Sequence, residues 1–201
     1  MIRSFVKWAD QPRQNGIVAA IEQVLAHAPL SILDMGCGHG QLAKRLKQNN
    51  GKRQITGVDV VVQPDCAIPV SVYDGTTIPF ADDSFDAVLC IDMLHHTDNP
   101  TAILQEARRV ARKWVIVKDH IADSKWDHRT LTVLDWMGNA GTGVPLPYNF
   151  LSSAQWQSAF DRAGLVEKAK VHPLRYWPGV IGHLFDRQYH FVSKLEKYAQ
   201  M

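Results

Sequence analysis

Side chains that can do chemistry stand at the ends of several short apolar runs in this sequence. Four of these runs are followed by an aspartate: Asp34, Asp59, Asp74 and Asp92. An ionised carboxylate accepts hydrogen bonds from hydroxyl and amino groups, so these positions suit recognition of a polar ligand. Three histidines also stand close behind apolar runs: His95 and His96 after the run that precedes Asp92, and His120 after one further run. The usual histidine pKa, about 6.5, suits proton removal at neutral pH, and a purely structural role is the alternative for each ring.

Residues 31–45, SILDMGCGHGQLAKR, contain three glycines at alternate positions, Gly36, Gly38 and Gly40. An apolar run precedes them, and a segment typical of a helix start follows. Glycine adopts backbone angles that other residues avoid, and its missing Cβ lets a ligand lie against the main chain. The helix start adds free N–H groups and a partial positive charge. This order predicts a nucleotide-type cofactor site, with a structural turn as the alternative.

The spacing of these glycines argues against a dinucleotide cofactor. A dinucleotide-binding turn follows G-x-G-x-x-G, which would place its third glycine at position 41. That position holds Gln41, and Gly40 comes one residue too early. An NAD-dependent oxidoreductase therefore stays only as a lesser alternative.

The arrangement D-x-G-x-G-x-G at residues 34–40 resembles motif I of the class I S-adenosylmethionine-dependent methyltransferases. The residues PF at 79–80 and SFD at 84–86 are similar to the small-molecule, "methyltransferase type 11"-like members. The resemblance implies an α/β fold with a doubly wound, Rossmann-like, mostly parallel seven-stranded sheet. It also implies an antiparallel terminal strand, helices on both faces, S-adenosyl-L-methionine as the cofactor and methyl transfer as the reaction.

The same resemblance implies where the cofactor would bind. The glycine turn would meet its methionine end through Asp34, Gly36, Cys37, Gly38 and Gly40. Asp59, followed by Val60, lies near the distance at which a βαβ nucleotide site places a carboxylate on ribose hydroxyls. Asp74, followed by Gly75, matches the family's acceptor for the adenine amino group. The sulfonium would then point toward Asp92 and the histidines beyond it.

Apolar periodicity predicts alternating helices and strands in a single domain over residues 1–201. Helices are expected at 13–28, 41–47, 98–111 and 152–163. Strands are expected around 32–33 and at 55–60, 68–73, 85–91, 114–118, 166–171 and 189–195, the last two as an antiparallel hairpin edge. Residues 121–150 and 172–187, approximately, are expected to form insertions on the substrate side.

The insertion at 121–150 is expected to shape a pocket for the methyl acceptor. Its aromatic side chains include Trp126, Trp136 and Tyr148, and in the resembling fold this connection often lies over the cofactor. A surface helix followed by a loop is the alternative. The chain lacks both an Asn-Pro-Pro-Tyr motif and a cysteine pair. These absences favour an oxygen or carbon atom of a small molecule as the acceptor.

Composition narrows the class of partner. A formal net charge of +2 over 201 residues gives no argument for nucleic acid or an anionic membrane. No apolar run approaches the roughly 20 residues of a membrane span, and the first residues lack the apolar core of a signal peptide. Scattered cysteines at positions 37, 66 and 90 suit reduced thiols in the cytoplasm. We therefore expect a cytoplasmic protein with a small-molecule substrate, and its oligomeric state stays open.

Histidines and aspartates are dense between residues 95 and 128, but none falls in a spacing typical of zinc ligands. The sequence therefore predicts no metal. The acids at positions 34, 59 and 74 favour cofactor binding without implying turnover. The main alternative to an enzyme is therefore a non-catalytic S-adenosylmethionine-binding or partner protein with this fold.

Overall fold

The computed structural model describes residues 2–25, 31–139, 146–176 and 188–198, with side chains from residue 11 onward. Three expected features lie partly outside these ranges: the helix end at 26–28, residues 140–145 of the insertion at 121–150, and most of the insertion at 172–187. The described elements are α1 (Ile2–Leu25), β1 (Ser31–Met35), α2 (Gln41–Asn49), β2 (Gln54–Asp59), β3 (Val70–Val72), β4 (Phe85–Ile91), a short 3-10 helix (Leu94–His96), α3 (Pro100–Val110), β5 (Ala111–His120), α4 (Lys125–Asn139), α5 (Ser153–Arg162), β6 (Leu165–Val171) and β7 (His190–Lys197).

The strands form one seven-stranded sheet in the order β3-β2-β1-β4-β5-β7-β6. The first five strands pair in parallel, and β7 runs antiparallel to both β5 and β6. The predicted doubly wound, Rossmann-like sheet with an antiparallel terminal strand is therefore confirmed. The last strand in the sequence lies inside the sheet, between β5 and β6, so that β6 forms the edge.

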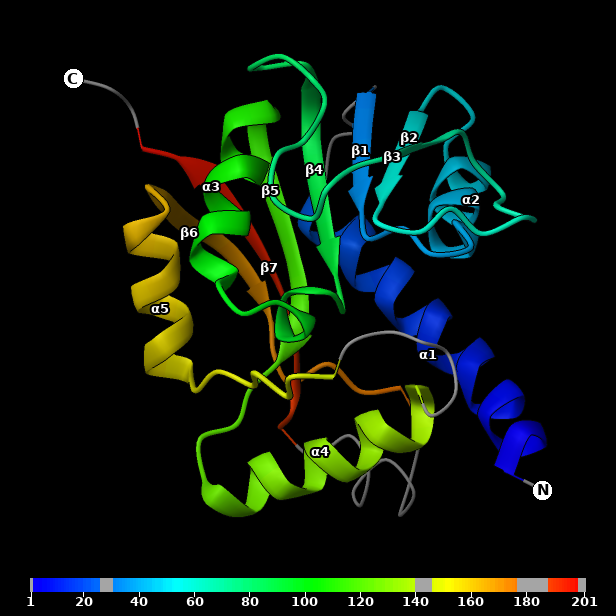
Figure 1. The fold of residues 1–201 in the computed structure, drawn as a ribbon, viewed down its shortest axis with the longest axis vertical. Coiled ribbons are helices and arrows are strands. Elements are labelled where there is room, and N and C mark those ends of the chain that lie inside the picture. Colours follow the sequence, from blue (N-terminus) through cyan, green and yellow to red (C-terminus); the bar gives the residue numbers. More distant parts are fainter. Residues whose placement is uncertain (1, 26–30, 140–145, 177–187, 199–201) are drawn as a thin grey trace.

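Helices cover both faces of the sheet (Figure 1). Buried side chains of α1 and α2 share one hydrophobic cluster with Ile32 of β1, and those of α3 and α5 share another with Leu33. Neighbouring residues of a strand point to opposite faces, so each central strand supplies both clusters. This double coverage explains why the central strands are apolar at nearly every position.

The parallel strands place their carboxyl ends along one edge of the sheet, where the predicted site residues follow. The helix α4 crosses beyond the carboxyl ends of β4 and β5, at the bottom of Figure 1. A ligand at this edge would therefore lie between the strand ends and α4, the usual place for a ligand in a doubly wound sheet.

The first helix is longer than predicted, because α1 begins at Ile2 and continues through Pro12. A proline inside a helix removes one backbone hydrogen bond and costs about 3 kcal/mol. The turns after it bury Ile17, Ile21 and Leu25 almost completely. Burial of three large apolar side chains, at about 1.5–3 kcal/mol each, outweighs that cost.

Candidate functional site

The glycine turn between β1 and α2 has the conformation that its sequence predicts. Gly36, Gly38 and Gly40 all have positive φ, at 66°, 52° and 65°. A Cβ on Gly36 would lie 3.0 Å from the Cβ of Met93, and one on Gly40 would lie 2.8 Å from Ile68. A Cβ on Gly38 would meet no atom within 4 Å. The outer two glycines are thus required by packing. The space beside the middle one, Gly38, is open, so a ligand can lie against the backbone there.

The cysteine of the turn has a different surrounding. A Cβ added to Gly57 of β2 would lie only 2.5 Å from Sγ of Cys37, so the missing side chain of Gly57 makes room for this thiol. The side chain of Cys37 therefore packs toward the strand, and its contribution to a ligand would come from its backbone. Its neighbour His39 is exposed at the outside of the turn.

Asp34, at the end of β1, is a buried carboxylate, with 4% of its surface exposed. Burial, and then the negative charge of Asp59, raise the pKa of Asp34 to about 7. This carboxyl group is therefore partly protonated at neutral pH when no cation lies beside it. A positively charged ligand group would favour its ionised form.

Asp59, at the end of β2, holds the backbone around the turn. Its Oδ2 accepts a hydrogen bond from the N–H of Gly38 at 2.8 Å, and its Oδ1 accepts one from Val61 at 3.2 Å. Each carboxylate oxygen has a second lone pair, so both can still accept hydrogen bonds from ligand hydroxyls. The structure therefore brings Asp59 to the glycine turn and gives it a structural role as well.

The end of β3 lies beside the end of β2. Asp74 is exposed, and its Oδ1 accepts hydrogen bonds from the N–H groups of Thr76 at 2.8 Å and Thr77 at 2.7 Å. These bonds lower the pKa of Asp74. Gly75 has a φ of 82°, and a Cβ there would lie 3.3 Å from Val60, which is half exposed. Val60 and Gly75 therefore lie side by side, next to Asp74.

Asp92, just beyond β4, lies between two cations. Its carboxylate forms ion pairs with Lys118 of β5 and Arg13 of α1. Burial opposes its ionisation, but these two charges hold the pKa of Asp92 well below its usual range. Lys118 is completely buried, so it requires this carboxylate as a partner. Sequence reasoning missed both cations, although a lysine within an otherwise apolar strand is a signal from which Lys118 could be found.

A second network surrounds Asp119, the residue after Lys118. Its Oδ1 lies 2.7 Å from Nδ1 of His95 and accepts a hydrogen bond from the N–H of His120 at 2.8 Å. Its Oδ2 accepts one from the N–H of Leu94 at 3.2 Å. Burial opposes the charge on His95, but Asp119 raises the pKa of His95 to about 10. The ring of His95 is therefore positively charged at neutral pH, with a proton on both nitrogens, in the absence of another cation.

The other predicted histidines differ from His95. Burial, and then the charge of Lys118, lower the pKa of His120 to about 4. Its Nδ1 lies 3.2 Å from Oδ1 of Asp119, and 15% of its side chain is exposed. Burial also lowers the pKa of His96. His190 of β7, which sequence reasoning missed, has its ring centroid 4.9 Å from that of His120.

The predicted aromatic residues are divided between two environments. Trp126 and Trp136 lie on α4 with 65% and 57% of their surfaces exposed, so in this structure they line no enclosed pocket. Tyr148 is partly buried and packs against the small cluster that contains Phe150. The ring of Phe150 stacks on that of His95 with centroids 5.2 Å apart. The segment after α4 therefore reaches the histidines, while the two tryptophans face outward.

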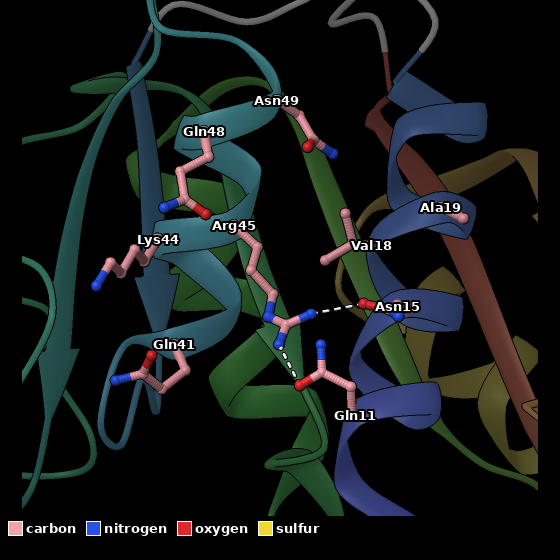
Figure 2. Close-up of a pocket in the computed structure, with 9 residues that line it drawn as sticks. All are labelled: Gln11, Asn15, Val18, Ala19, Gln41, Lys44, Arg45, Gln48 and Asn49. Atoms are coloured by element: carbon pink, nitrogen blue, oxygen red, sulfur yellow. Dashed lines mark hydrogen bonds between the residues drawn. The ribbon is translucent and has the colours of Figure 1, made fainter.

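A polar groove lies elsewhere, between α1 and α2 (Figure 2). The guanidinium of Arg45 donates hydrogen bonds to Asn15 at 2.5 Å and Gln11 at 2.9 Å across this groove. None of the predicted site residues lines it, so we do not assign it to the site. Among the described helices, none has the length and apolar character needed to cross a membrane.

The chain matches a family model described as a methyltransferase domain over residues 9–167. It is 29% identical over 126 residues to the O-methyltransferase resE of Aspergillus sclerotiorum, which covers 52% of this chain and 47% of that protein. It is 26% identical over 104 residues to a ubiquinone biosynthesis O-methyltransferase of Dechloromonas aromatica, covering 46% and 44%. The chain thus spans about half the length of these curated relatives.

The fold is also similar to that of a solved structure, 1,6-didemethyltoxoflavin-N1-methyltransferase of Burkholderia thailandensis with 1,6-didemethyltoxoflavin and S-adenosylhomocysteine bound. The two share 15% identity with a TM-score of 0.65, over 94% of this chain and 80% of that one. At this identity the likeness supports the fold alone.

Proposed function

Because this chain belongs to the methyltransferase domain family, as its glycine turn predicts, we propose that it transfers a methyl group from S-adenosylmethionine to an oxygen atom of a small molecule. The observation that carries the proposal is the left-handed glycine turn, in which Gly38 is bonded to Asp59 and has open space beside it, next to the buried carboxylate of Asp34. The two curated relatives described above, both O-methyltransferases by name, favour oxygen over carbon as the acceptor atom.

The residues present fit this cofactor. Asp34 offers a buried carboxylate to a cationic group at its methionine end, and Asp59 offers two oxygens to its ribose. Val60 and Gly75 lie together where the adenine would bind, with Asp74 as an acceptor for its amino group. When bound, S-adenosylmethionine supplies a methyl group already activated by its sulfonium. The protein has to exclude water, align the acceptor and remove its proton.

His120 is the residue that we assign to proton removal. Nδ1 of His120 faces the carboxylate of Asp119, which can only accept a hydrogen bond. The neutral ring therefore carries its proton on Nδ1, and Nε2 can accept the proton of the substrate. Asp119 would then stabilise the imidazolium that forms. His95 is buried, with Nδ1 bonded to Asp119, and serves to hold that carboxylate in position. Tyr148 and the neighbouring aromatic ring of Phe150 are proposed to contact the acceptor.

Other expectations stay predictions. They are the contact of Trp126 and Trp136 with the substrate, the single domain, the cytoplasmic location and the absence of a nucleic-acid partner. A protein that binds the cofactor without turnover is the second candidate function. It is distinguished from the first by activity alone, because both require the same cofactor site.

The cofactor site is tested by calorimetry with S-adenosylmethionine on the parent, on Gly38→Ala and on Gly138→Ala. A methyl group at residue 38 would occupy the open space beside the turn and strain its positive φ, whereas Gly138 lies exposed on α4 with free space around it. We expect binding to weaken at least tenfold in Gly38→Ala only. Gly38→Ala is preferable to a change at Gly36, where a new side chain would meet Met93 and disturb the fold. Equal affinity in all three proteins would place the cofactor elsewhere.

Methyl transfer is tested with a radiolabelled donor and a panel of phenols, carboxylic acids and amines. We expect product from hydroxyl-bearing acceptors and a label on oxygen. A labelled carbon or nitrogen would correct the acceptor atom. Cofactor binding without any product from the panel would favour the non-catalytic alternative.

A further inference from the structure

We propose that His95, His96 and Asp135 form a binding site for a divalent transition-metal ion, and that zinc is the preferred ion. The three residues come from different parts of the fold: the histidines from the 3-10 helix after β4 and the aspartate from α4. Each offers one ligand atom, and these atoms all lie within 4.8 Å of one another. Two imidazoles and one carboxylate are a ligand set that zinc and neighbouring metals accept.

The distances between these groups suit an ion better than direct hydrogen bonds. Nε2 of His95 lies 3.6 Å from Oδ1 of Asp135, and Nε2 of His96 lies 3.9 Å from the same oxygen. Both separations exceed a hydrogen bond. In a tetrahedral zinc site with bonds of about 2.0–2.1 Å, neighbouring ligand atoms lie about 3.3 Å apart. The two histidine–aspartate separations are therefore a few tenths of an ångström longer than in such a site, and the ligand atoms of the two histidines lie within 4.8 Å of each other.

Unused bonding capacity also points to a missing ligand. Oδ2 of Asp135 and Nδ1 of His96 are buried, and neither has a hydrogen-bond partner within the described parts of the chain. Oδ1 of Asp135 accepts a hydrogen bond from Asn139 at 2.7 Å, which fixes the orientation of this carboxylate. Buried polar atoms without partners are rare, because each loses its bonds to water. An ion on the carboxylate of Asp135 would supply the missing interaction of Oδ2, whereas a His96 ring that binds the ion through Nε2 keeps Nδ1 for another partner.

The surroundings of His95 support this choice of ligands. Its Nδ1 faces Asp119 at 2.7 Å, which leaves Nε2 directed toward Asp135. A ligating histidine commonly donates its other ring N–H to a carboxylate, which fixes the ring and its tautomer. Asp119 itself is a poorer ligand, because its Oδ1 already has two partners, the N–H of His120 and Nδ1 of His95, and its Oδ2 accepts the N–H of Leu94. The geometry therefore favours Asp135 over Asp119 in the first shell of the ion.

Three protein ligands would leave a position open to an oxygen atom of the acceptor. An ion there would lower the pKa of an acceptor hydroxyl and help it to lose its proton. That role depends on the proposed methyl transfer, whereas binding of the ion does not. Sequence spacing predicts no metal because two ligands are adjacent and the third lies on another element, about 40 residues later.

The test is calorimetric titration of the full-length, untagged, metal-free chain with Zn²⁺, without methyl donor or acceptor. Absorption of the Co²⁺-loaded protein reports the geometry around the ion. We expect one ion per chain and the visible bands of four- or five-coordinate cobalt. Asp135→Asn and His96→Gln should each weaken binding at least tenfold. The matched controls Asp127→Asn and His128→Gln, on α4 and outside the cluster, should bind as the parent does.

Circular dichroism checks that each variant folds, and because the two ligand variants lie on different elements, either one can decide the outcome. Absence of zinc binding in the parent, or equal weakening in the control variants, would overturn the proposal. In that case the protonated ring of His95 alone bridges Asp119 and Asp135. Since no methyl donor is present, either result is independent of whether the chain transfers methyl groups.

Discussion

Three aspartates of the site perform different tasks because their immediate surroundings differ. Asp34 is buried near another acid and holds its proton to about pH 7. Asp59 accepts hydrogen bonds from two backbone N–H groups, one of Gly38 in the turn and one of Val61 after β2. Asp92 is kept ionised by Lys118 and Arg13. The same side chain is therefore partly protonated at Asp34, a hydrogen-bond acceptor at Asp59 and a counter-ion at Asp92.

Cofactor affinity should depend on pH through Asp34. The free protein binds a proton on this carboxyl below about pH 7, and a cationic cofactor favours the ionised form, so binding must expel that proton. We expect affinity to fall as pH drops, by roughly fivefold between pH 7 and pH 6 for a single proton. Calorimetry across this range measures it. In Asp34→Asn the affinity should be weaker and nearly flat with pH; an unchanged slope would assign the proton to another group.

Asp59 should contribute through ribose and through the turn. Asp59→Ala removes a charged acceptor, and hydrogen bonds to charged groups are worth about 1.5–3 kcal/mol each, so cofactor affinity should fall at least tenfold. Asp59→Asn keeps one carbonyl oxygen and should lose less. Asp65→Ala, an exposed acid in the next loop, is the control. If all three variants bind as the parent does, Asp59 only terminates β2.

At the scale of the element, the carboxyl end of β5 joins two networks. Lys118 and Asp119 are consecutive, so their side chains point to opposite faces of the sheet. Lys118 is linked to α1 because Asp92 pairs with both Lys118 and Arg13. Asp119 is linked to the 3-10 helix by its contact with His95. His120, at the strand end, contacts Asp119 and lies 3.8 Å from Asp92. One strand end thus connects the elements on both sides of the site.

Substitution of His120 should separate binding from turnover. In His120→Gln we expect turnover of an acceptor found by the panel to fall by roughly 10²–10⁴-fold, because the proton acceptor is lost. Cofactor affinity should stay within twofold, since the ring is not assigned to the cofactor. His128→Gln on α4 should leave both quantities unchanged. Turnover that survives in His120→Gln would remove this residue from the reaction.

At the scale of the molecule, the buried charges link the site to stability. Lys118 is fully buried on a central strand, and its pair with Asp92 connects β4 and β5 beneath α1. Burial lowers the pKa of Lys118, and Asp92 opposes that effect. Charges of this kind cost free energy unless paired, so their presence inside a sheet is typical of a functional site.

Removal of Lys118 should therefore destabilise the whole fold. Breaking a buried pair costs about 3–5 kcal/mol, and we expect Lys118→Met to lower the free energy of unfolding by about 3 kcal/mol, since Arg13 still accompanies Asp92. Urea denaturation measures this change. Lys113→Met, an exposed lysine on the same strand, should change it by less than about 0.5 kcal/mol. Equal stability of the two variants would show that the buried pair contributes nothing.

The order of strands and helices could be predicted from local pattern. The helix expected at 98–111 is α3, where Asn99 accepts a hydrogen bond from the N–H of Ala102 and Pro100 occupies the first turn. Prediction failed where a distant contact decided the outcome. The start of α1 depends on burial of its later turns against the sheet, and on α4 only the structure separates the buried Leu131 from the exposed Trp126 and Trp136.

Residue types and short spacings were enough to predict the glycine turn, the acids at the ends of β1 and β2 and just beyond β3 and β4, and the family to which the chain belongs. These features depend on residue type and short spacing, because positive φ and strand ends are local properties. Only the tertiary structure decided which charged groups meet. Arg13, Asp92 and Lys118 are far apart in sequence, and Asp135 reaches the histidines only because α4 crosses the carboxyl ends of the strands. Ion pairs and ligand sets depend on distances in space, which spacing along the chain does not specify.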